Sequence, residues 1–106
     1  MNKQKLYLAL LTVYENNFRV LHWKASGKHF LSEHNKYSDY YEKLGEYMDE
    51  TAEQLLSMGE DPINAYNAIN YLREDDSVHA TLVNPDDDFC PIKATQAAVE
   101  MFNTLY

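Results

Sequence analysis

The apolar positions in the first half of the chain predict two long helices. Apolar side chains recur at steps of three and four over residues 7–25 and again over residues 37–55, which is the spacing of one face of an α-helix. Residues that commonly cap or end helices flank these stretches: Asn2, Gly27, Ser32 and Gly59. Because only a few residues separate the two helices, we expect an antiparallel hairpin.

The second half of the chain predicts two shorter helices joined by a loop. Asp61 followed by Pro62 is typical of a helix start, and this helix is expected to end near Arg73. Residues 74–88 are rich in acids and predict a loop, in which residues 78–83 could form a short extended piece. Pro91 opens a last helix with an apolar face of Ala94, Ala97, Ala98, Met101, Phe102 and Leu105. The predicted fold class is therefore all-α.

Length and composition indicate a single globular domain. The chain has 106 residues, of which 45% are hydrophobic and 25% are charged, and a chain of this size buries only a modest core. Help from a partner chain is therefore plausible. No apolar run approaches the roughly 20 residues that a membrane-spanning helix needs. With one cysteine, Cys90, and no segment typical of a secretory leader, a cytoplasmic location is expected.

Negative charge is concentrated in the second half of the chain. The formal net charge is -8. Residues 1–53 carry eight acids and seven bases, a net charge of -1, whereas residues 54–106 carry nine acids and two bases, a net charge of -7. Non-specific binding to DNA requires cations that neutralise phosphates, and the N-terminal Lys3 and Lys5 are too few to form a basic arm. We expect no direct binding to DNA or to an anionic membrane.

Histidine and carboxylate residues in the predicted hairpin form the candidate chemistry. His22 and His34 lie near its turn, and Asp49 and Glu53 follow on the second helix. This combination of ligands suits iron, zinc or manganese. His34, Asp49 and Glu53 fall on one stripe of the helix, yet His34 and Glu53 are roughly 28 Å apart along its axis, because each residue rises about 1.5 Å. One ion cannot reach both ends.

Two copies of the second helix can resolve this distance. If the copies pack antiparallel about a twofold axis near Lys43 and Leu44, His34 of one copy lies beside Asp49 and Glu53 of the other. Two identical sites then form in each dimer, and His22 can join them because it also lies near the hairpin turn. Dimers of this symmetry are the commonest closed assemblies.

The residues from His22 to Pro62 resemble the Dps family of mini-ferritins. The matching positions are His22, Trp23, Lys24, Gly27, Phe30, His34, the run from Asp49 to Leu56, Gly59 and Pro62. The resemblance implies a ferroxidase centre at a dimer interface that oxidises Fe(II), commonly with hydrogen peroxide. It implies that His22, His34, Asp49 and Glu53 are ligands of iron, as one ion or a dinuclear pair, and that Trp23 beside the centre can trap an oxidising equivalent.

Two features depart from the resembled family. Its remaining carboxylate should stand four residues after His34, where this chain has Ser38. The neighbouring Asp39, rotated by about 100° around the helix, or a water molecule is expected to replace it. Family members also complete a four-helix bundle and a hollow shell, whereas only a short helix follows the loop here. The chain is therefore interpreted as a single truncated ferritin-like domain, residues 1–106, with its bundle completed by dimerisation.

A second function from a different class stays open. The histidines can be hydrogen-bonded interface residues, the carboxylates can form a solvated helix face, and Trp23 can be a packing residue of the hairpin. On this interpretation the chain is a non-catalytic structural or adaptor subunit of a larger assembly. The sequence therefore predicts either a Dps-like metal oxidoreductase or such a structural module.

Overall fold

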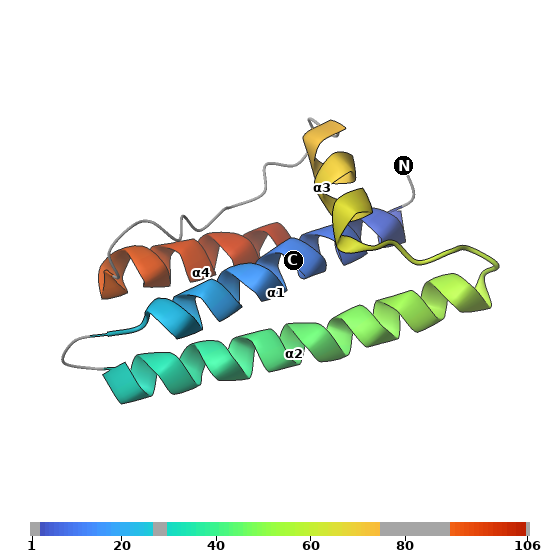
Figure 1. The fold of residues 1–106 in the computed structure, drawn as a ribbon. Helices are drawn as coiled ribbons and strands as arrows, with labels where there is room; N and C mark the ends of the chain where they lie inside the picture. The colour runs from blue at the N-terminus through green and yellow to red at the C-terminus, as the bar shows by residue number, and fades with distance from the viewer. Residues whose placement is uncertain (1–2, 27–29, 75–89, 106) are drawn as a thin grey trace.

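The computed structural model describes residues 3–26, 30–74 and 90–105 of the 106-residue chain. Its secondary structure there is helical: α1 (Lys3–Lys24), α2 (Phe30–Ser57), α3 (Ala65–Glu74) and α4 (Pro91–Leu105). The two long helices lie side by side and antiparallel, which confirms the predicted hairpin (Figure 1). Some of the sequence-based predictions lie outside the described residues. They concern the caps Asn2 and Gly27, the extended piece at residues 78–83, and all but the first residue of the loop expected at residues 74–88.

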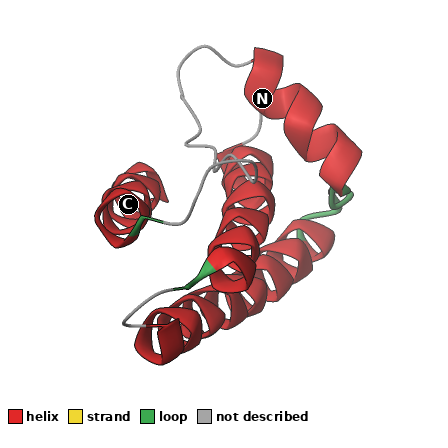
Figure 2. Ribbon diagram, turned by 60° about the vertical axis from the view of Figure 1, so that its left-hand side comes forward, coloured by secondary structure: helices red, strands yellow, loops and turns green. Residues whose placement is uncertain are grey.

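Helix α1 is the centre of the molecule, because it contacts each of the other three helices. Helix α4 runs along the part of α1 near the hairpin turn, and α3 crosses the opposite part of α1 (Figures 1 and 2). The side chains that this arrangement buries most completely are Leu11, Tyr14, Phe18, Tyr37, Leu44, Leu55 and Met101. Nearly all of them belong to the apolar positions that the sequence assigns to one face of each helix.

Aromatic rings join the three helices α1, α2 and α4. Phe18 lies 5.2 Å from Tyr40 and 5.4 Å from Phe102 between ring centroids, and Tyr40 meets Phe102 edge-on at 5.3 Å. Asn17 Nδ2 also donates to the sulfur of Met101 at 3.5 Å. These contacts fix α4 against the hairpin, and they confirm the predicted apolar face of the last helix.

The start of the third helix differs from the prediction. The helix begins at Ala65 rather than at Pro62. The Asn64 side chain accepts the Asn67 amide at 2.8 Å, and the Asn67 side chain accepts the Asn64 amide at 3.3 Å. This reciprocal cap satisfies amides that would otherwise be unpaired in the first turn. The helix buries Ala68, while Tyr66 and Ile69 are exposed.

An open groove lies between the start of α1 and the second half of α2. Its volume is about 340 Å³, and its lining comes from the first residues of α1 and the second half of α2, including Tyr7, Tyr47 and Thr51. Partial burial and the nearby Tyr47 and Glu50 raise the pKa of Tyr7.

Over the described residues, no helix is both long enough and apolar enough to cross a membrane.

Candidate metal centre

His22 and His34 meet across the hairpin near its turn. His22 lies in the last turn of α1 and His34 in the second turn of α2. Their imidazole rings stack with centroids 3.6 Å apart at an angle of 27°. His22 Nδ1 lies 2.8 Å from the backbone oxygen of His34, and His34 Nδ1 lies 3.0 Å from the backbone oxygen of His22. Each histidine therefore holds the other helix by a hydrogen bond.

These reciprocal hydrogen bonds determine which nitrogen of each ring carries the proton. A backbone carbonyl oxygen can only accept, so both Nδ1 atoms must donate. In the neutral rings, each Nε2 then has the lone pair that a metal ion binds. A backbone carbonyl as the partner of the second nitrogen is the usual arrangement around metal-binding histidines. The structure thus brings together two of the predicted ligands in a form suited to metal binding.

Aromatic and charged neighbours hold the two imidazoles in place. Tyr41 meets the His22 ring edge-on at a centroid distance of 5.3 Å, and Phe30 lies 5.1 Å from the His34 ring. The Arg19 guanidinium lies 4.1 Å above the Tyr41 ring and forms an ion pair with Glu15. Sequence reasoning did not identify Tyr41 and Arg19 as supporting residues. Their spacing was a usable signal, because Tyr41 follows His34 by two helical turns and Arg19 precedes His22 by about one.

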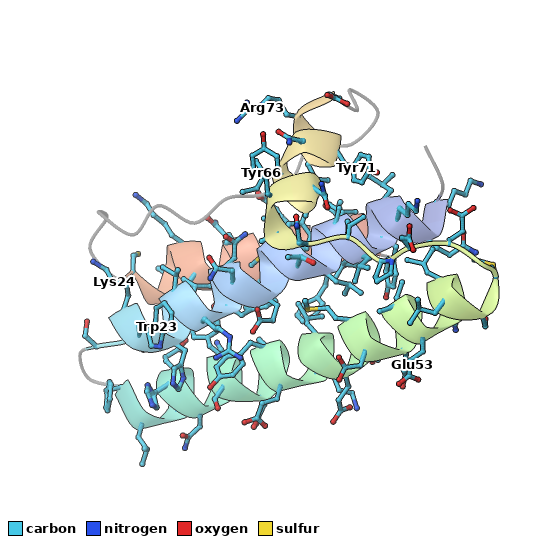
Figure 3. All side chains as sticks on the ribbon, turned by 45° about the vertical axis from the view of Figure 1, so that its right-hand side comes forward. Trp23, Lys24, Glu53, Tyr66, Tyr71 and Arg73 are labelled. Atoms are coloured by element: carbon cyan, nitrogen blue, oxygen red, sulfur yellow. The ribbon has the colours of Figure 1, made fainter. Side chains whose placement is uncertain are left out.

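The predicted carboxylate ligands do not meet the histidines within one chain. Asp39, Asp49 and Glu53 are exposed on α2, and Glu53 points away from α1 at the end of the hairpin opposite to Trp23 (Figure 3). Within the described ranges, no three residues of the types His, Cys, Asp and Glu lie close enough to hold an ion. One copy therefore supplies two imidazole nitrogens, and any further donors must come from elsewhere.

The remaining residues of the candidate centre lie at the surface. Trp23 follows His22 directly, and its side chain is 65% exposed. Ser38 stands one turn after His34 and is half-buried. Gly45 lies near the middle of α2, where an added Cβ atom would meet nothing within 4 Å. The surface of α2 around Gly45 is therefore uncrowded.

Comparison with curated proteins finds relatives that are longer than this chain. The chain is 33% identical over 98 residues to the DNA protection during starvation protein of Porphyromonas gingivalis, covering 87% of this chain and 62% of the relative. It is 39% identical over 57 residues to the protein of that name in Listeria innocua, covering 54% and 36%. An uncharacterized protein of Haemophilus influenzae is 36% identical over 74 residues, covering 67% and 46%. No protein-family model matches.

Solved structures show the same arrangement of helices. The DPS protein from Vibrio cholerae O1, a member of a broad superfamily of ferritin-like diiron-carboxylate proteins, superposes with a TM-score of 0.79 at 26% identity. The match covers 96% of this chain and 60% of that one. Dps from Listeria monocytogenes gives a TM-score of 0.74 at 23% identity, covering 97% and 66%. These matches confirm the predicted ferritin-like, all-α fold class.

Proposed function

Because this chain belongs to the Dps family of ferritin-like proteins, we propose that it binds iron at a site shared by two copies and oxidises Fe(II) there. The stacked pair of His22 and His34 is the observation that carries this proposal, since both rings offer Nε2 to a metal. The chain spans less than two thirds of the relatives described above, so the activity of the whole assembly is part of the proposal.

The missing ligands come from a second copy of α2 packed antiparallel. His34 and Glu53 are equally far from the midpoint between Lys43 and Leu44, and so are Ser38 and Asp49. A twofold axis at that midpoint brings Glu53 and Asp49 of the second copy to the histidine pair. Two imidazoles and two carboxylates form a donor set that suits iron, with zinc or manganese as competitors. The same axis sets Leu31 opposite Leu56, two side chains that are 67% and 58% exposed in one copy.

In the proposed reaction, Fe(II) is the substrate and peroxide or dioxygen is the electron acceptor. Each Fe(II) gives up one electron, so reduction of one peroxide molecule to water consumes two Fe(II) ions and two protons. The carboxylates of Asp49 and Glu53 stabilise the higher charge of the product Fe(III). Asp39 or a water molecule takes the place that Ser38 leaves without a carboxylate. Trp23, next to His22, can trap a stray oxidising equivalent.

Rapid mixing of Fe(II)-loaded protein with peroxide tests this function. Protein loaded without oxygen should show a fast rise of Fe(III) absorbance. Glu53→Ala should reduce its rate by about 100-fold or more, because even residues that only orient metal ligands change affinity or activity by about 10- to 100-fold. Glu50→Ala is the matched control, because Glu50 is also an exposed acid of α2 but lies on another side of the helix. Equal rates for the wild type and Glu53→Ala would reject the proposal.

Two observations favour the alternative function, a structural subunit without catalysis. A single copy brings together only two of the predicted ligands, and Ser38 replaces a carboxylate. If this alternative holds, His22→Ala combined with Glu53→Ala leaves assembly unchanged and purified protein carries no stoichiometric metal. Iron or zinc that is present in the wild type and absent from the double variant would reject it. For either function we propose a cytoplasmic location, which suits the unpaired thiol of Cys90.

A further inference from the structure

We draw no further inference here: the strongest candidate, the open groove between the start of α1 and the second half of α2 that Tyr7 and Tyr47 help to line, carries none, because nothing in the part of the chain that the structure describes shows what covers it.

Discussion

At the scale of single residues, the histidine pair depends on side chains that do not bind metal themselves. Tyr41 lies edge-on against the His22 ring, and the Arg19 guanidinium lies over the Tyr41 ring. Because a ring of fixed orientation loses less entropy when it binds an ion, such supporting residues raise metal affinity.

Replacement of Tyr41 tests this support. We expect Tyr41→Leu to weaken Co²⁺ binding by about tenfold, the lower end of the effects seen for residues that orient metal ligands. Tyr41→Phe keeps the ring edge and should retain most of the affinity. Titration of Co²⁺ followed by visible absorbance measures both variants. Equal weakening by Leu and Phe would mean that the hydroxyl group, rather than the ring, is responsible.

Tyr37 makes the stability of the folded protein depend on pH in the alkaline range. Its burial, and secondarily the nearby carboxylate of Glu33, raise the pKa of Tyr37 above the ordinary value of 10.0. The unfolded chain therefore loses this proton at a lower pH than the folded chain. The contribution of Tyr37 to the free energy of unfolding is therefore constant below pH 10. It falls above pH 10, by at most about 1.4 kcal/mol per pH unit.

Urea unfolding between about pH 9 and pH 11.5 checks this sign. Tyr37→Phe should flatten the loss of stability above pH 10, because phenylalanine has no proton to release. Tyr66→Phe is the control, since Tyr66 is 73% exposed and its removal should leave the slope unchanged. A wild-type protein that becomes more stable between pH 10 and pH 11.5 would contradict the prediction.

At the scale of elements, hydrophobic spacing was sufficient to predict α1, α2 and α4. Their buried residues repeat with the helical period, and Pro91 marks the start of α4 as expected. The start of α3 was wrong because two caps compete there. Asp61 followed by Pro62 is one possible helix start. The structure instead uses Asn64, three residues later, whose side chain and backbone amide form reciprocal hydrogen bonds with Asn67. Such a choice depends on the path of the chain after α2, which local sequence does not reveal.

Gly59 ends α2 and offers a test of this element. Its φ angle is +76°. The Gly59 amide donates to Leu56 at 3.1 Å, and the Glu60 amide donates to Leu55 at 2.9 Å, which is the Schellman pattern. Gly59→Ala should destabilise the protein by about 1 kcal/mol, because an L side chain disfavours this backbone conformation.

Gly45→Ala is the matched control within the same helix. An added Cβ atom has open space there, so alanine should stabilise the protein by about 0.5 to 1 kcal/mol through its higher helix propensity. Thermal unfolding of dilute, chelator-treated protein compares the two variants without contributions from metal or self-association. A change of the same sign in both would show that the conformation of Gly59 is not the cause.

At the scale of the whole molecule, the candidate site was only partly predictable from one chain. The spacing of His22 and His34 about the turn predicted that both residues lie near it, and the structure stacks their rings against each other. The carboxylates of Asp49 and Glu53 lie far along α2, and in the proposed site they come from a second copy. The spacing of residues along the sequence can indicate where a twofold axis between two copies would lie. It cannot give the strength of the contact between the copies, which depends on charge, burial and bound ions.

The net charge of -8 gives a prediction for the whole particle. We expect the purified protein not to shift duplex DNA in a gel at about 0.15 M salt, because each neutralised phosphate requires a cation and acidic surfaces are repelled. Relatives carry the name DNA protection during starvation protein. The experiment therefore tests whether this chain differs from what the name of those relatives suggests. Tight, salt-sensitive retardation would show that assembly creates a basic surface.

The short reach of α4 divides the hairpin into halves of different local stability. Near the turn, α4 lies along the hairpin (Figure 1), and rings from α1, α2 and α4 pack around Phe18. Farther along, α2 borders an open groove. Amide protons exchange with solvent water through local openings, which are easiest where few apolar contacts must be broken. Deuterium should therefore enter the second half of α2 well before the segment around Tyr37. The histidine end of the hairpin would remain ordered while its carboxylate end opens and closes.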